Sequence, residues 1–262
     1  MNRSFYFVER TWEEIGELAR QGAVILFPIG QVEEHGKHLP VGADAMIAEG
    51  LCTAIGEELA RSTSIPFLVL PCLWSGYSAK ALRKWPGTIA LSPRTVMDIV
   101  EGVCGSLIEM GFRRLLLLNA HGHHSDLLRL AAREIGDMHG VHPVAVELAK
   151  LGAEEFQQIR RSAPGGAIHG CEYETSLLLH FRERVEMSKA VKEPMEYHSR
   201  FYAGDNFAGS SLIFWSTWSI QQSRTGIYGD PTVASAETGR RVCEAIVRNA
   251  VEFIKEFVAM TA

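Results

Sequence analysis

Residues 23–30 read AVILFPIG and are followed directly by the polar segment QVEEHGKHLPVGAD at 31–44. A continuous apolar run that ends in Pro and Gly is typical of a strand buried on both faces, as in parallel sheets. The segment after it is polar and punctuated by Gly and Pro, which indicates a loop. The chain therefore predicts a buried parallel strand that leads into a loop rich in acidic and histidine side chains.

Apolar runs alternate with helical periodicity on either side of this stretch. Further strands are predicted at 65–71, 113–122 and 141–149, and helices at 11–21, 45–60, 93–111, 124–138, 173–181 and 235–258. The alternation predicts an α/β fold, a three-layer αβα sandwich with a mostly parallel central sheet. Because the chain contains no repeat, low-complexity tract or linker, we expect residues 1–262 to form a single domain.

Composition narrows the class of protein. The chain is 47% hydrophobic and carries a net charge of −5, which argues against a nucleic-acid partner because phosphate-binding faces need excess Lys and Arg. The five scattered cysteines form no CxxC pair, as expected in a reducing cytoplasm. The N-terminus has no signal-peptide pattern, and no apolar run reaches the roughly 20 residues that span a bilayer. We expect a cytoplasmic protein without a membrane partner.

Two groups of polar side chains follow predicted strands. Glu33, His35, His38 and Asp44 lie in the loop after the first strand, and three His occur within residues 121–124. Because the carboxyl ends of parallel strands meet at one edge of a sheet, the two loops are expected to share a site. Carboxylates and imidazoles together are ligands of divalent metals, and a carboxylate can bridge two metals about 3.5–4 Å apart.

Several motifs together resemble one family. Glu33-x-His35-Gly-x-His38-Leu-Pro, followed by Asp44, is similar to the first signature of the creatininase (creatinine amidohydrolase) family. The other elements that resemble this family, in the same order along nearly the whole chain, are Pro86-Gly87-Thr88, Asn119-Ala-His121-Gly, His169 with Glu172-x-Glu174-Thr-Ser, and Gly229-Asp230-Pro231.

The resemblance implies a creatininase-like fold and two divalent metal ions per subunit, zinc with manganese or iron. Carried over by position, Glu33 and His121 would hold one metal, His35 the other, and Asp44 would bridge them. Glu172 would complete the second metal's ligands, and we expect it to join His169 as a catalytic group. His123 and His38 are candidates for an extra ligand or a substrate contact, whereas Glu174 is interpreted as a helix N-terminal acid or a partner of a ligand. The resemblance also implies a homo-oligomer, commonly a hexamer.

The function expected from this site is metal-dependent amide hydrolysis of a small-molecule substrate. Two metals lower the pKa of a bound water from about 15.7 toward about 7, and the resulting hydroxide would attack the carbonyl carbon of a cyclic amide or formamide. The same site could instead open a cyclic ketone of the inosose type by C–C cleavage. A third interpretation is a metal-stabilised binding or assembly protein, with residues 197–218 as its interface.

The loop before Pro86 departs from the family pattern. Ala81 and Leu82 stand where the family often has Glu-His, and Lys80, Arg83 and Lys84 surround them. A basic loop of this kind favours a polar or anionic substrate over creatinine.

Overall fold

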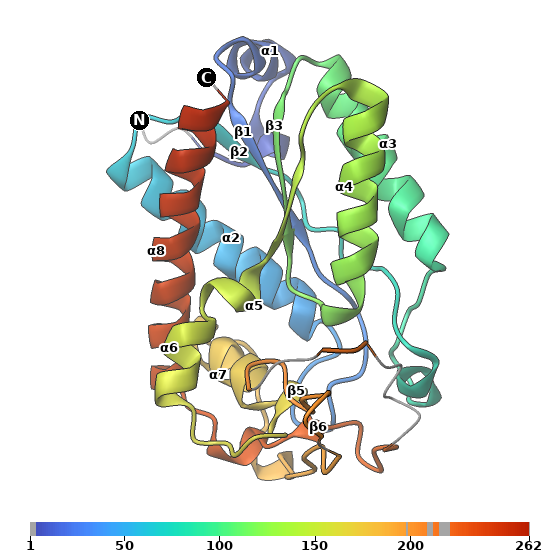
Figure 1. Cartoon of the computed structure of the whole chain (residues 1–262). Helices are drawn as coiled ribbons and strands as arrows, with labels where there is room; N and C mark the ends of the chain where they lie inside the picture. The colour runs from blue at the N-terminus through green and yellow to red at the C-terminus, as the bar shows by residue number, and fades with distance from the viewer. Residues whose placement is uncertain (1–3, 198, 209–211, 215–220, 262) are drawn as a thin grey trace.

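The central sheet consists of four parallel strands in the order β2-β1-β3-β4 (Figure 1). The computed structural model describes residues 4–197, 199–208, 212–214 and 221–261. The strands are β1 (Val24–Ile29), β2 (Phe67–Val69), β3 (Arg114–Asn119) and β4 (Val144–Glu147). Every residue of β1 is buried, in agreement with the predicted strand that is covered on both faces.

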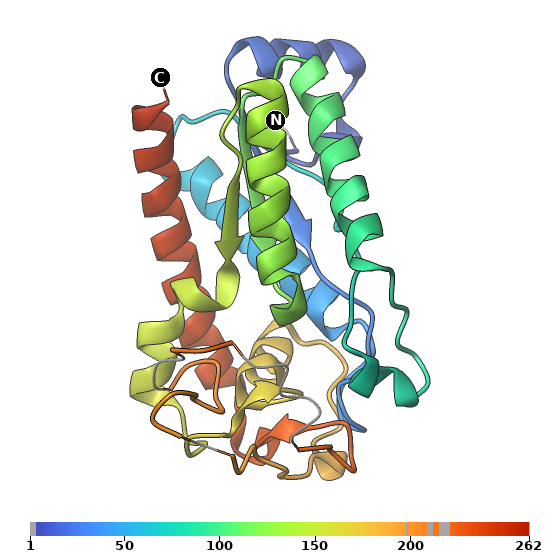
Figure 2. The same cartoon turned by 45° about the vertical axis from the view of Figure 1, so that its right-hand side comes forward.

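Helices cover both faces of this sheet, and alternate residues of β1 belong to different cores. Val24 and Leu26 pack toward one helical layer, whereas Ile25 and Phe27 pack toward the other. The first layer comprises α2 (Ala43–Ser62), α5 (Leu148–Leu151), α6 (Ala153–Ile159), α7 (Glu172–Phe181) and α8 (Ala236–Met260). The second layer comprises α1 (Trp12–Arg20), α3 (Pro93–Glu109) and α4 (Ser125–His139), and Figure 2 shows α3 and α4 side by side. The predicted αβα sandwich is confirmed.

Local signals place the helix ends where the sequence predicts them. The side chain of Thr11 accepts a hydrogen bond from the amide of Glu14, and the Glu14 carboxylate accepts one from the amide of Thr11, which forms a capping box. The side chain of Ser92 accepts from the amide of Thr95 at the start of α3. Among the described residues, every helix is too short or too polar to cross a membrane.

The sequence did not predict a second, smaller sheet. Strands β5 (Ala167–His169) and β6 (Tyr228–Gly229) pair in antiparallel fashion. Figure 1 shows this pair and α7 at the end of the molecule toward which the central strands run. The site is therefore built between the carboxyl ends of β1 and β3 and the segment from β5 into α7.

Candidate metal centre

Five candidate ligand residues reach this end of the sheet from four elements. Glu33 and His35 lie in the loop after β1, Asp44 in the first turn of α2, His121 just after β3, and Glu174 in the first turn of α7. Because β1 and β3 are neighbouring parallel strands, their loops begin side by side. Glu33 and His35 are 0% exposed and Asp44 is 1% exposed, so their charges are removed from water.

Asp44 lies between two histidines. Its Oδ1 atom is 3.2 Å from Nε2 of His35, and its Oδ2 atom is 2.8 Å from Nδ1 of His121. The Oε1 atom of Glu33 lies 3.6 Å from Nδ1 of His121 and 3.4 Å from Nδ1 of His169. The structure thus brings the predicted Glu33, His35, Asp44, His121 and His169 together.

Backbone carbonyl groups select the tautomer of each histidine, because a carbonyl oxygen only accepts hydrogen bonds. Nδ1 of His35 donates to the Glu33 carbonyl at 3.1 Å, and Nε2 of His121 donates to the Tyr77 carbonyl at 3.0 Å. Nε2 of His169 donates to the Glu34 carbonyl at 2.7 Å. In the neutral histidines the other ring nitrogen of each therefore carries no proton and faces carboxylate oxygens. Metal-binding histidines are held in this way.

Three carboxylate oxygens of the cluster lack a hydrogen-bond donor among the described residues. Both side-chain oxygens of Glu33 and Oδ2 of Asp44 are buried without a hydrogen-bond partner among the described residues. Oδ2 lies only 2.8 Å from Nδ1 of His121, a distance that suits two ligands of one cation as well as a donor and an acceptor. Buried charges without compensation cost several kcal/mol. Divalent cations would satisfy these atoms, so the donor set fits a metal centre.

In the metal-free protein, protons on the histidines partly compensate the negative charge of these carboxylates. Burial lowers the pKa of His121, but the carboxylates of Glu33 and Asp44 outweigh burial and raise it to about 9. The pKa of His35 is likewise raised despite burial, by Asp44, Glu174 and Glu33. The pocket therefore attracts positive charge, and a metal would compete with these protons.

Candidate ligand atoms fall into three groups whose members lie within 4.8 Å of one another. One group joins Glu33 to two histidines of the β3 loop, and another joins Asp44 to His35 and an acid of α7. The three groups are Glu33, His121 and His123; His35, Asp44 and Glu174; and Glu33, His35 and His169. Each group could hold a divalent cation, and Asp44 lies close to both His35 and His121.

Glu172 is placed differently from the sequence prediction. Its carboxylate accepts hydrogen bonds from the backbone amides of Arg161, at 2.9 Å and 3.1 Å, and of Ser162, at 2.8 Å. It therefore fixes the loop after α6 and lies outside the three groups. Glu174 is in the cluster instead, with Oε1 3.9 Å from Nε2 of His35. Two acids two residues apart on a helix point in different directions, so Glu174 faces the cluster while the Glu172 carboxylate faces the backbone amides. The ligand and catalytic role expected of Glu172 stays a prediction.

The two extra histidine candidates have different surroundings. His38 is 2% exposed, and its Nε2 atom lies 3.0 Å from the Thr175 hydroxyl. Burial, with the nearby His35 and His169, lowers its pKa to about 4. His38 is therefore a neutral buried group beside the cluster, whereas His123 belongs to one of the three ligand groups.

A cavity of about 350 Å³ opens onto the cluster. Its wall includes the aromatic side chains of Tyr173, Tyr202 and Phe207, and its charged groups beyond the cluster include Arg129 and Lys150. None of the basic residues 80–84 lines it; Arg83 donates to the Ser78 carbonyl instead. The geometry therefore gives no support to the idea that this basic loop selects the substrate.

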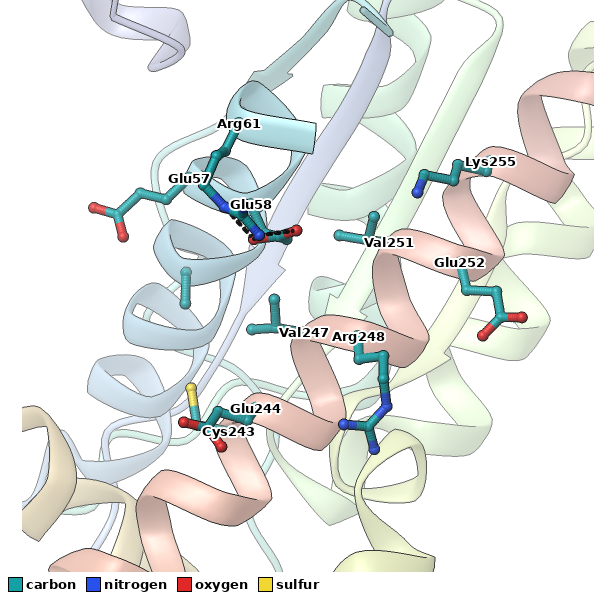
Figure 3. A pocket seen from close by; sticks show the side chains of 11 residues that line it. Glu57, Glu58, Arg61, Cys243, Glu244, Val247, Arg248, Val251, Glu252 and Lys255 are labelled. Carbon is teal, nitrogen blue, oxygen red and sulfur yellow. Dashed lines mark hydrogen bonds and ion pairs between the residues drawn. The ribbon is translucent and has the colours of Figure 1, made fainter. Parts of the chain in front are cut away.

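A second hollow, of about 790 Å³, lies between α2 and α8 (Figure 3). Its floor includes Val247 and Val251, and Glu58 and Arg61 pair with each other along its α2 side. No group of candidate metal ligands among the described residues lies in it. The candidate metal ligands lie instead near the carboxyl ends of the central strands.

The family model of creatininase, described as creatinine amidohydrolase, matches residues 8–254. The chain belongs to the creatininase family. It is therefore a hydrolase of that family, and the likeness in motifs noted in the sequence extends over almost its whole length.

Known relatives act on different substrates. The chain is 24% identical to the creatinine amidohydrolase of Pseudomonas putida, with 98% of each chain covered. It is 26% identical to the 3-dehydro-scyllo-inosose hydrolase of Thermotoga maritima, covering 97% of this chain and 83% of that one. It is also 26% identical to the mycofactocin precursor peptide peptidase of Mycobacterium tuberculosis, covering 98% and 97%.

A solved structure titled as a manganese creatininase has the same fold. It aligns with a TM-score of 0.78 and 25% identity over 97% of this chain and 98% of that chain. The creatininase-like α/β fold predicted from the sequence is thus confirmed.

Proposed function

We propose that this protein is a binuclear metal-dependent amidohydrolase that cleaves a C–N bond of a small substrate. The observation that carries the proposal is the set of buried histidine nitrogen and carboxylate oxygen atoms that face one another around Asp44. One metal would be held by Glu33 and His121, with His123 beside them. The other would be held by His35 and Glu174. Asp44 would offer one oxygen to each, and the metals would be zinc, manganese or iron.

Two metals would supply a nucleophilic water near neutral pH and polarise the carbonyl group of the substrate. A side chain of the protein would carry the proton from the attacking water to the leaving group. His169 is 4% exposed, and its Nε2 atom is fixed by the Glu34 carbonyl. Its Nδ1 atom is the one that faces Glu33, so Nδ1 would accept a proton and return it to the leaving nitrogen. Glu172 has no part in this proposal, because its carboxylate is committed to backbone amides.

The relatives favour cleavage of a C–N bond, and the pocket limits the size of the group that is cleaved. A cavity of about 350 Å³ suits a small molecule or one end of a larger one. Two of the three kinds of relative are named as an amidohydrolase and a peptidase, both of which cleave C–N bonds. A cyclic amide, a formamide or the end of a short peptide would fit the same chemistry.

C–C cleavage in a cyclic ketone is the second candidate, because one relative is named as an inosose hydrolase. It would use the same metals and a different leaving group. From the family alone we also propose a cytoplasmic homo-oligomer, with a hexamer as the expected form. The interface suggested for 197–218 falls partly outside the described residues.

A panel of lactams, formamides, short peptides and cyclic ketoses, assayed with the metal-loaded protein, tests the proposal. We expect turnover of at least one amide, and its loss in His35→Ala. Turnover of ketoses alone would favour the second candidate. Tight metal binding without turnover of any substrate would favour a binding or assembly protein.

A further inference from the structure

His124 lies behind a proposed metal ligand rather than in the ligand set. It is 0% exposed, and its ring packs edge-on against the ring of His121 with centroids 4.6 Å apart. Its Nε2 atom accepts a hydrogen bond from the backbone amide of Tyr77 at 2.9 Å. The three groups of candidate metal ligands do not include His124.

Tyr77 links the two histidines through its backbone. Its amide donates to His124, and its carbonyl accepts the Nε2 proton of His121 at 3.0 Å. Because Nε2 donates to this carbonyl, Nδ1 is the nitrogen of His121 that is directed at Asp44 and is available to a metal. A displacement of Tyr77 would therefore release the ring of His121 and allow the other tautomer.

Gly76, the residue before Tyr77, allows the contact between His124 and the Tyr77 amide. A Cβ atom at Gly76 would collide with the ring of His124, so only glycine allows the close approach. On the other side, the Gly76 amide donates to Oε1 of Gln31 at 2.6 Å, and Nε2 of Gln31 donates to the Ile89 carbonyl at 3.1 Å. Gln31 and His124 thus hold the segment from two sides.

We propose that His124 is a positioning residue for the metal held by Glu33 and His121, acting through the backbone of Tyr77. The inference rests on the proposed metal centre and adds a residue that touches neither metal. The role requires that Nε2 of His124 accept the hydrogen bond of the Tyr77 amide, as it does at 2.9 Å. Loss of the Nε2 acceptor should weaken metal binding at the position of Glu33 and His121 and leave metal binding at the other position unchanged.

The test is a titration of metal-free protein with Zn²⁺ against a competing chelator, in wild type, His124→Leu and His124→Gln. The side-chain amide of Gln places an oxygen acceptor near the position of Nε2, whereas Leu removes the acceptor. We expect His124→Leu to weaken one of two Zn²⁺ ions by about 10–100-fold, the range for lost partners of metal ligands. His124→Gln should recover most of that affinity. His139→Leu, at the exposed end of α4, is the matched control.

Each outcome separates the inference from the proposed function. A wild type that binds no metal would contradict the metal centre itself. A wild type with two metals, together with a His124→Leu variant that binds both equally well, would overturn only the role of His124. The role of His124 would also be overturned if the Leu and Gln variants lost Zn²⁺ affinity equally, or if affinity fell equally at both metal positions. Should the Leu variant not fold, His124→Met and Gly76→Ala disturb the same contact and are expected to give the same selective loss.

Discussion

Oδ2 of Asp44 lies 2.8 Å from Nδ1 of His121, the nitrogen that the Tyr77 carbonyl leaves without a proton in the neutral ring. Two acceptors at this distance repel each other unless a proton or a metal ion lies between them, and a metal ion would take the place of the proton that His121 holds because its pKa is raised to about 9. Because Oδ1 of Asp44 also faces His35, the same carboxylate can serve two cations. Asp44 is therefore the residue on which both proposed metal positions depend.

Asp44→Asn should remove both metals while leaving the fold intact, because Asn keeps the volume but not the charge. The metal content, measured by elemental analysis after gel filtration, is expected to fall from two metals per chain to fewer than one. Asp126→Asn, whose parent side chain is 77% exposed, is the control and should keep both. A fully loaded Asp44→Asn protein would show that Asp44 is not shared between the metals.

Glu174→Gln and Glu172→Gln should have opposite effects. The first should lose the metal held with His35 and keep thermal stability, because its carboxylate lies in the ligand cluster. The second should keep both metals but lower the free energy of unfolding by about 1–3 kcal/mol, since its carboxylate accepts buried backbone hydrogen bonds. Metal content and urea denaturation measure the two effects. If metal is lost only in Glu172→Gln, the sequence prediction would hold and the assignment of Glu174 would be wrong.

The sequence predicted the central sheet well because its strands are continuous apolar runs between Gly, Pro and polar loops. It did not predict β5 and β6, because strands of three and two residues carry no measurable alternation. The site was predicted to the level of its loops, since strand ends converge in parallel sheets. The choice between Glu172 and Glu174 depends on the direction of each side chain from α7. The tautomers depend on carbonyl groups of Glu34 and Tyr77 that no side-chain motif reveals.

Metal binding should release protons at pH 7. Although burial lowers the pKa of His121, Glu33 and Asp44 raise it to about 9 in the metal-free protein, above the ordinary 6.5. The protonated ring therefore stabilises the metal-free fold below pH 6.5, and this contribution is lost as pH rises through about 9. A metal must displace that proton, so apparent affinity should increase with pH up to about 9. Calorimetry in two buffers of different ionisation enthalpy counts the protons, and a count of zero would contradict this account.

The Glu147→Gln variant should become more stable to thermal unfolding than wild type as pH rises from 4 to 7. Burial raises the pKa of Glu147, partly offset by the hydrogen bond that Asn119 donates to it at 2.8 Å. The charged form therefore costs stability in the folded chain above the ordinary pKa of 4.5, and Gln removes that cost while it can still accept from Asn119. Thermal unfolding across this pH range is the measurement, with the exposed Glu154→Gln as control. A difference that does not change with pH would contradict the buried-charge argument.

The most direct measurement is anomalous X-ray diffraction from crystals of the metal-free protein soaked in Zn²⁺. The account predicts two peaks per chain, about 3.5–4 Å apart, on either side of the carboxylate of Asp44. One peak should lie beside Nδ1 of His121 and the other beside Nε2 of His35. No peak between these side chains, or a single peak remote from Asp44, would contradict the binuclear centre and the hydrolysis proposed from it.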